Sequence, residues 1–291
     1  MRNKILVPLC GVDESMTGFS INGWEIKKLD PTCESKTIID EMPDTDAYKQ
    51  IRLLLDTEDV FSALPFINDI QNPCYFVFVK ETDDISDIGA IIDVLRLIKS
   101  SKFGCWMPVT LKHGHIFPVE KGRSYTSNAI EMRDLLSLSE DEQSRVSLLL
   151  RNREKRLYPS SVNTMLSFFH DSCRSMNLFL SFVTRITVLE ILIDGNAELS
   201  YRIKHHVAVL LGRNKNESIE IADNLKKAYT ARSKFLHEGE SKIVTEEMMK
   251  IAFEYSRRVI ANLLCVSDDM KTIRITLEQA GYGDNPYNAI F

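Results

Sequence analysis

The chain has 291 residues, of which 44% are hydrophobic and 26% are charged, as in ordinary globular proteins of one or two domains. A chain of this length can bury a core without disulfides or structural metals. The formal net charge of −5 argues against a protein coated in basic charge for nucleic acid. The six cysteines form no CxxC pair and no recurring spacing, which argues against a zinc site and a disulfide framework.

Neither the N-terminal segment nor the most apolar segment of the chain indicates a membrane protein. The apolar run after the basic N-terminus is shorter than a signal peptide needs, and it contains Pro8. The most apolar segment, residues 178–193, is interrupted by Arg185 and Glu190. We therefore expect a buried helix there, no membrane span, and a cytoplasmic protein.

Residues 1–135 predict an α+β domain whose role the sequence leaves unknown. The dipeptide Asn22-Gly23 lies between alternating apolar residues, which is a strong signal for a two-residue β-hairpin. Hydrophobic spacing indicates the other elements. They are strands at residues 74–79, 103–111 and 115–119, and helices at residues 46–55, 58–70 and 86–98.

From residue 139 onward every pattern indicates a helix. Ser139 and Glu142 form a capping box, which opens the first of them. The next helices are expected at residues 162–176, 178–193, 199–211 and 217–239, from residue 245 onward, and at residues 268–280. We expect a helical domain at residues 139–281 and a C-terminal tail at residues 282–291.

The helix expected at residues 217–239 carries polar chemistry on its apolar side. The three-or-four spacing of a single helical stripe is followed by Ile221, Leu225, Ala228 or Tyr229, then Arg232 and Leu236. A guanidinium on that stripe must have a partner or open onto a cleft, since a buried unpaired charge is very costly. His237 then lies in the last turn, because glycine two residues later is the usual helix terminator.

The segment Arg232-Ser-Lys-Phe-Leu-His237 resembles the Arg-x4-6-His motif of the HEPN superfamily, and its flanking Tyr229 and Gly239 resemble the Apea-like HEPN group. Residues 185–190 and 201–212 are similar to the first two core helices of that group, so the likeness covers residues 160–265. The resemblance implies an all-α HEPN-like bundle that forms a homodimer. It also implies a metal-independent endoribonuclease that leaves 2′,3′-cyclic phosphate ends, in antiviral defence or a toxin-like role.

By this resemblance His237 is the acid-base group and Arg232 anchors the phosphate. RNA cleavage without metal needs a base for the 2′-hydroxyl proton and a cation for the phosphorane, which histidine and arginine supply at neutral pH. Ser233 departs from the Asn, Asp or His that many active members have after the arginine, although its hydroxyl can still donate to a phosphate oxygen. Glu190 is the candidate partner of Arg232, and Arg185 with Glu190 is expected to form an internal network that orients the core helices.

Positive charge is concentrated in the part of the chain that contains Arg232. Residues 199–234 contain eight Lys or Arg and three acids, whereas residues 30–59 contain nine acids and three bases. A local basic face can bind phosphate where the average charge cannot. Arg202, Lys204, Lys226 and Lys227 are the residues expected to contact RNA, and an ordinary solvated helix face is the alternative.

Other chemistries have weaker support in the sequence. There is no GxSxG, no GxxxxGK[ST] phosphate loop and no GxGxxG, so no cofactor is expected. His113-Gly-His115 fits a hairpin tip better than a metal site, and His205 and His206 lie about 100° apart on a helix. Asp83 and Asp84 are adjacent and point apart in a strand or loop, so we expect no metal site and no pair of acid-base carboxylates.

Two further functions stay open beside the ribonuclease. One is a non-catalytic HEPN module that binds RNA, a nucleotide or a regulatory protein partner. The other is a regulatory scaffold in which Arg232 pairs with a carboxylate and His237 helps the helix to end through the helix dipole. The N-terminal domain would recognise a trigger or a substrate.

Overall fold

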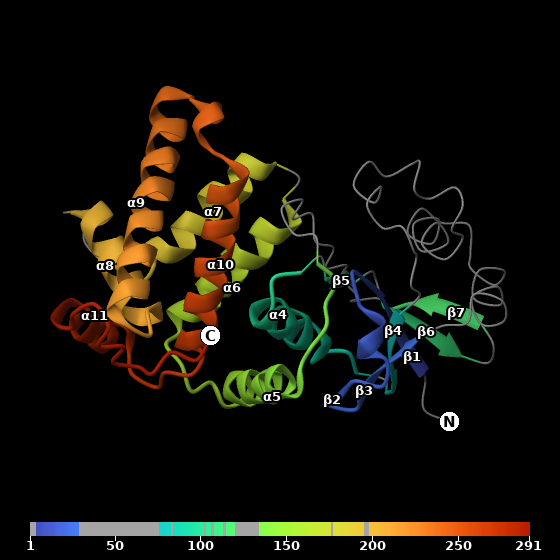
Figure 1. Ribbon diagram of the computed structural model, residues 1–291. Helices are drawn as coiled ribbons and strands as arrows, with labels where there is room; N and C mark the ends of the chain where they lie inside the picture. The colour runs from blue at the N-terminus through green and yellow to red at the C-terminus, as the bar shows by residue number, and fades with distance from the viewer. Residues whose placement is uncertain are drawn as a thin grey trace. The chain divides into compact units, whose positions relative to one another are not determined.

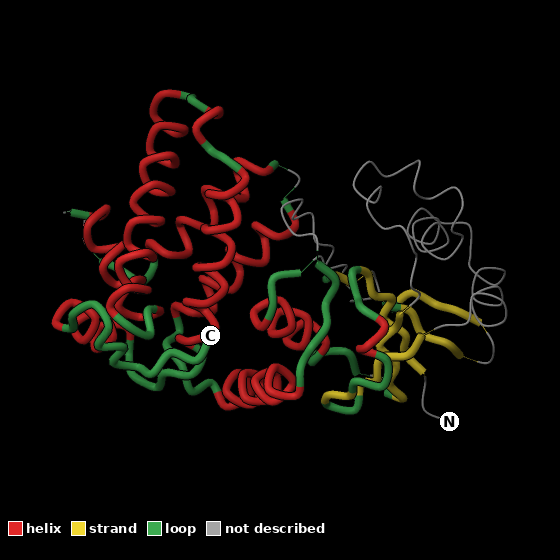
Figure 2. Tube along the Cα trace, viewed as in Figure 1, coloured by secondary structure: helices red, strands yellow, loops and turns green. Residues whose placement is uncertain are grey.

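The computed structural model describes residues 4–28, 76–82, 84–101, 103–105, 108–112, 115–119, 134–175, 177–194 and 198–291. The helices expected at residues 46–55 and 58–70 lie outside the described residues, as do Asp83 and His113. The chain divides into two compact units. They are the described parts of residues 1–92 with 101–143, and of residues 93–100 with 144–291. All described strands belong to the first unit, and the described elements of the second are helical (Figure 2).

The first unit is built on an antiparallel sheet with β1 (Lys4–Cys10) at its middle. The strand order is β2-β3-β4-β1-β6-β7, and β5 also pairs with β1 (Figure 1). The strand bounds are β2 Ser20–Ile21, β3 Trp24–Lys28, β4 Phe76–Glu81, β5 Gly104–Cys105, β6 Val109–Lys112 and β7 His115–Pro118. The sequence patterns did not predict β1 as a strand. Its Val7 is fully buried opposite Phe78 of β4.

The predicted hairpin is confirmed. Ile21 pairs with Trp24, and Asn22 and Gly23 between them have φ angles of 49° and 81°. Positive φ at both central residues is the geometry of a type I′ turn, which twists in the same sense as the strands. The fully buried indole of Trp24 donates from Nε1 to Asp87, 3.0 Å away.

The prediction of one strand over residues 103–111 is wrong. β5 and β6 are separate strands, and Pro108 immediately precedes β6. Because proline has no N–H, it is found at the start of a strand more readily than in the interior of a sheet. Residues 109–112 pair with residues 115–118, and Leu111 lies opposite Ile116 in the β6–β7 ladder.

Helix α4 (Ile88–Ile98) begins in the first unit and ends in the second. The later helices agree in order with the sequence prediction. They are α5 Glu140–Lys155, α6 Ser161–Arg174, α7 Leu178–Glu190, α8 Leu199–Leu211, α9 Lys215–Glu238, α10 Glu246–Leu263 and α11 Met270–Gln279. Helix α10 packs against α6, α7, α8 and α9, and α8 lies alongside α9 (Figure 1). This shared contact places the core of the second unit around α10.

Local signals end and join these helices as expected. Ser139 Oγ accepts from the Glu142 N–H at 3.2 Å, and Glu142 returns a carboxylate to the Ser139 N–H at 2.8 Å, which is the predicted capping box. At the turn between α8 and α9, a Cβ on Gly212 would lie 2.2 Å from Ser218 Oγ. Glycine therefore lets the two helices approach closely at their junction.

The C-terminal residues 282–291 contain no helix or strand and pack back onto the helical unit. Asn262 Oδ1 accepts from the Ile290 N–H at 2.9 Å, and Arg258 Nε donates to the Phe291 carbonyl at 2.9 Å. No helix in the described part of the chain is long and apolar enough to cross a membrane.

Candidate functional site

The helix that carries Arg232 and His237 has well-defined ends. At its start the Asn214 side chain accepts from the Glu217 N–H at 3.0 Å. At its end Gly239 has a φ of 70°, and its N–H donates to the Phe235 carbonyl at 3.1 Å. This left-handed cap is the one that glycine forms most readily, so the helix stops two residues after His237.

The predicted apolar stripe of α9 is confirmed only in its first part. Ile221 and Leu225 are buried, whereas Leu236 is 47% exposed, so the prediction is wrong at the C-terminal end. Helix α8 has 13 residues and α9 has 24, or about 20 Å and 36 Å of length. Because α8 runs back along α9 from a short turn, it cannot cover the last turns of α9.

Arg232 is paired with Glu190, as the sequence suggested. Its Nη2 lies 3.3 Å from Oε2 of Glu190, the last residue of α7, and each side chain is 21% exposed. The Arg232 Nε is buried and has no hydrogen-bond partner. A guanidinium carries five N–H donors, so Glu190 leaves most of them available to another acceptor.

Tyr229 completes this small cluster, although the sequence assigned it no role in the site. The guanidinium carbon of Arg232 lies 5.9 Å from the centre of the Tyr229 ring, one helical turn earlier. Burial, and then the neighbouring Glu190 carboxylate, raise the pKa of Tyr229. The phenol therefore stays protonated near neutral pH beside the ion pair.

His237 is exposed and has no hydrogen bond, ion pair or ring contact with the residues that the structure describes. Five residues along a helix correspond to about 140° of rotation and about 7.5 Å of rise. Arg232 and His237 of one chain therefore project from different sides of α9. Ser233 is half-buried beside Arg232 in sequence and is likewise rotated by about 100° from it.

Arg185 belongs to the core packing of the second unit. It is 1% exposed, its Nε donates to Ser172 Oγ at 3.2 Å, and its guanidinium carbon lies 4.8 Å from the centre of the Phe253 ring. These two contacts lie on α6 and α10, and the Glu190 carboxylate lies against Arg232 of α9. The internal network expected from Arg185 and Glu190 stays a prediction.

The predicted basic face is uneven. Arg202 lies 2.9 Å from Asp194 and 3.7 Å from Glu278, so two carboxylates offset its charge. The Lys204 ammonium lies 5.5 Å from the centre of the Tyr201 ring. Lys226 and Lys227 are exposed on α9. The two exposed lysines are the residues of this group best placed to meet a phosphate in solution.

The sequence analysis missed the pair of the buried His206 with the exposed Glu278. His206 is fully buried, and its Nε2 lies 2.7 Å from Glu278 Oε2, while its Nδ1 has no hydrogen-bond partner. Burial lowers the pKa of His206 despite the carboxylate, and the hydrogen bond from His206 lowers the pKa of Glu278. At neutral pH the imidazole is therefore neutral and donates to the carboxylate.

This pair predicts a loss of stability in mild acid. The unfolded imidazole takes up a proton near pH 6.5, which the buried imidazole accepts only at lower pH, so the free energy of unfolding falls as the pH is lowered through this range. Glu278, whose pKa is also lowered, adds a further loss of stability on acidification, but at a lower pH than His206 does. We expect His206→Asn to flatten the dependence of the urea midpoint on pH between about 5 and 7. The neighbouring His205→Asn is the matched control, and an unchanged slope in His206→Asn would contradict this assignment.

The comparisons with known proteins place the chain in no family. No family model matches it, and no curated protein or solved structure does so either. Among the described residues, no group of three or more His, Cys, Asp and Glu side chains is arranged to hold a metal ion.

Proposed function

We propose that the helical unit is a HEPN-like bundle and acts as an endoribonuclease that cuts RNA without a metal ion. The support is the resemblance of residues 232–237 to the Arg-x4-6-His motif, together with the surroundings of both residues. The substrate is single-stranded RNA, and the sheet unit recognises the trigger or the substrate. In this proposal the protein serves in antiviral defence or as a toxin.

The proposed reaction is an internal transfer at phosphorus. His237 takes the proton of the ribose 2′-hydroxyl, and the 2′-oxygen bonds to the adjacent phosphorus. The bond from phosphorus to the 5′-oxygen breaks, and that oxygen receives a proton from an imidazolium. The products are a 2′,3′-cyclic phosphate and a 5′-hydroxyl. Arg232 stabilises the charge on the phosphorane oxygens.

The hydrogen bonding of Arg232 supports the proposal most directly. Glu190 accepts from one nitrogen of the guanidinium, and the buried Nε has no hydrogen-bond partner. A phosphate oxygen is the preferred acceptor for such donors, because arginine–phosphate hydrogen bonds are charge-assisted. The exposed His237 is on the same helix and has no hydrogen bond or ion pair with the described residues. Lys226 and Lys227 add exposed positive charge for the flanking phosphates.

A second copy of the chain completes the proposed site. Since Arg232 and His237 project from different sides of α9, one phosphate meets both only if the partners come from two chains. An apolar surface adjoins His237: Leu236 is 47% exposed and Leu180 of α7 is 57% exposed. Between these helices the rings of Phe179 and Phe235 stack at 5.1 Å. We propose that this surface joins two copies about a two-fold axis.

A specific observation favours a second candidate function. An arginine with a purely structural role would also form the Arg232–Glu190 pair. In addition, Ser233 is at the position where many active HEPN proteins have Asn, Asp or His. A non-catalytic module that binds RNA, a nucleotide or a protein partner would keep the same fold. It would bind without turnover.

Incubation of the full chain with total RNA in EDTA, followed by analysis of the new ends, tests the proposal. We expect cleavage in the presence of the chelator, with 2′,3′-cyclic phosphate and 5′-hydroxyl ends. Cleavage that stops on chelation, or products with 3′-hydroxyl ends, would contradict it. Binding of RNA without any cleavage would favour the second candidate.

A further inference from the structure

Three rings line up on the surface of the helical unit, on α8 and just after α11. Tyr201 and His205 are one turn apart on α8, with ring centres 5.8 Å apart and planes within 7° of parallel. Tyr282 continues the row, with its ring centre 5.5 Å from that of His205 and its plane tilted by 30°. We call Tyr201, His205 and Tyr282 the aromatic row. None of the sequence patterns indicated that these residues meet.

The outer end of the aromatic row is open. Tyr201 is 51% exposed, although burial of a tyrosine ring is favourable. Its described ring contacts are with His205 on one side and with the ammonium of Lys204, 5.5 Å from its centre. Lysine has many rotamers, so its ammonium can move from the ring to a nearby anion.

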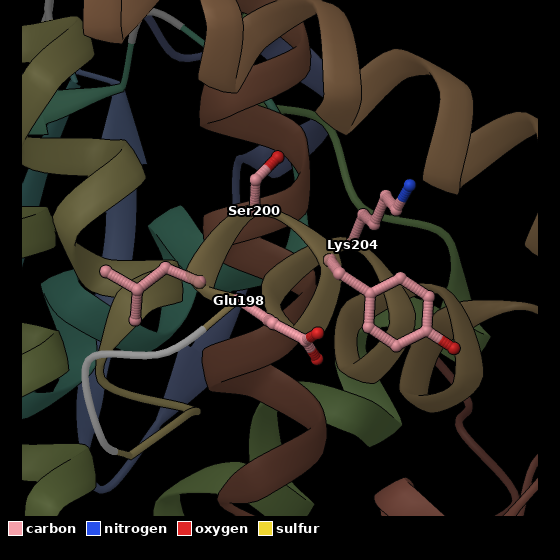
Figure 3. Close-up of a pocket in the computed structure, with 5 residues that line it drawn as sticks. Glu198, Ser200 and Lys204 are labelled. Carbon is pink, nitrogen blue, oxygen red and sulfur yellow. The ribbon is translucent and has the colours of Figure 1, made fainter.

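The exposed ring borders a hollow that contains polar groups. The hollow has a volume of about 570 Å³ and is lined by Glu198, Leu199, Ser200, Tyr201 and Lys204. Figure 3 shows Lys204, Ser200 and Glu198 around it. This volume is within the range of small-molecule sites. Lys204 forms no ion pair with a described carboxylate, so its charge is available to a ligand.

These groups match the parts of a nucleotide. A flat ring that is open at one face binds an unpaired base by stacking, and this binding tolerates any sequence because every base has a π-face. An ammonium next to the ring meets the phosphate. The Glu198 carboxylate and the Ser200 hydroxyl can accept hydrogen bonds from a ribose hydroxyl or a base amino group. A buried structural role would need neither the exposed Tyr201 ring nor a Lys204 ammonium without an ion-pair partner.

We propose that the aromatic row stacks an unpaired base of the single-stranded RNA that the enzyme cuts. The inference rests on the proposed function and adds a second contact for its substrate. Helix α8, which carries two rings of the row, packs along α9, the helix that carries Arg232 (Figure 1). Sequence-tolerant stacking there would hold the RNA without selecting its sequence.

The test measures binding of an unpaired pentaribonucleotide with a central 2-aminopurine to the full-length His237→Ala protein. We expect the fluorescence of the 2-aminopurine to be quenched on binding. Adding Tyr201→Ala with Tyr282→Ala should remove the quenching and weaken binding by about ten-fold, as loss of one stacked base does. Tyr201→Phe keeps the ring and should keep both signals. Phe168→Ala, at an exposed ring on α6, is the matched control.

The outcomes separate this site from the proposed function. If the Tyr201→Ala, Tyr282→Ala protein with intact His237 cuts and binds RNA as the unaltered protein does, the stacking site is wrong and the ribonuclease stands. If the unaltered protein neither binds nor cuts RNA, both are wrong. If AMP quenches and competes as well as the pentaribonucleotide does, the site takes a free nucleotide and its assignment to RNA is wrong. Lys226→Glu with Lys227→Glu should instead lower the salt dependence of binding and keep the quenching, because these residues contact phosphate only.

Discussion

His237→Ala is expected to lower the rate of RNA cleavage by on the order of 10²–10⁴, with EDTA present throughout. This range is the usual contribution of a positioned acid or base. The substitution should leave the fold intact, since His237 is exposed and has no hydrogen bond or ion pair with the described residues. The rate should be measured on a short defined RNA at saturating concentration, so that kcat is compared and not binding.

The control is in the same turn of the helix. Glu238→Ala also removes an exposed polar side chain beside the C-terminus of α9, and we expect its rate to stay within a few-fold of the unaltered protein. The pH dependence adds a second check, because the limb of the rate profile that reports the histidine should be absent in His237→Ala. Equal rates for His237→Ala and the unaltered protein would remove His237 from the chemistry.

Activity should return when two inactive variants are mixed. If the arginine of one chain serves the histidine of the other, a dimer of Arg232→Ala with His237→Ala has one wholly damaged site and one wholly intact site. Random reassociation makes about half of the dimers mixed, so about a quarter of the original activity should return. Each variant alone should stay inactive. The subunits must first be dissociated and then reassociated, with the mixed species confirmed by mass.

Arg232→Ala leaves the half-buried Glu190 carboxylate without its partner, which destabilises the folded protein. Arg232→Gln is therefore the better variant for the mixing test, since its amide can still donate to Glu190. Confirmed mixed dimers without activity would show that each site draws both residues from one chain, or that activity needs all four residues of the dimer together. The shared-site mechanism would then be wrong.

The premise of the mixing test can be examined at the apolar surface beside His237. Leu236→Glu places a charge on the surface that the second copy is proposed to cover, so it should shift the protein toward a monomer in sedimentation. Ile275→Glu is the matched control, because Ile275 of α11 is 48% exposed and Leu236 is 47% exposed. If the unaltered protein sediments as a monomer at micromolar concentration, the proposed dimer is wrong and the mixing test has no basis.

The order and type of most described elements could be read from local patterns. Asn22 and Gly23 specify a turn that needs positive φ at both residues, and Ser139 with Glu142 caps a helix within four residues of chain. Gly239 ends α9 for a similar reason. Each of these signals acts between residues that are neighbours in sequence, so the unfolded chain already carries the information.

The partner of Arg232 was an intermediate case. Glu190 could be proposed because it was an acid on a helix expected to be buried, and the structure places it 3.3 Å from the guanidinium. The exposure of Leu236 could not be foreseen, since it follows from α8 being too short to cover the end of α9. Helical periodicity predicts which residues share a face, but the length of the neighbouring helix decides how far along that face burial extends.

The remaining features arise only when distant segments meet. No sequence pattern predicted β1, which pairs with both β4 and β6. The apolar burial of Val7 and its neighbours outweighs the N–H donor that Pro8 lacks. Glu278 reaches His206 across 72 residues of sequence, and Tyr282 joins the ring of His205 from beyond α11. Such contacts depend on the packing of whole helices, and no local spacing of side chains encodes which distant residue will lie opposite.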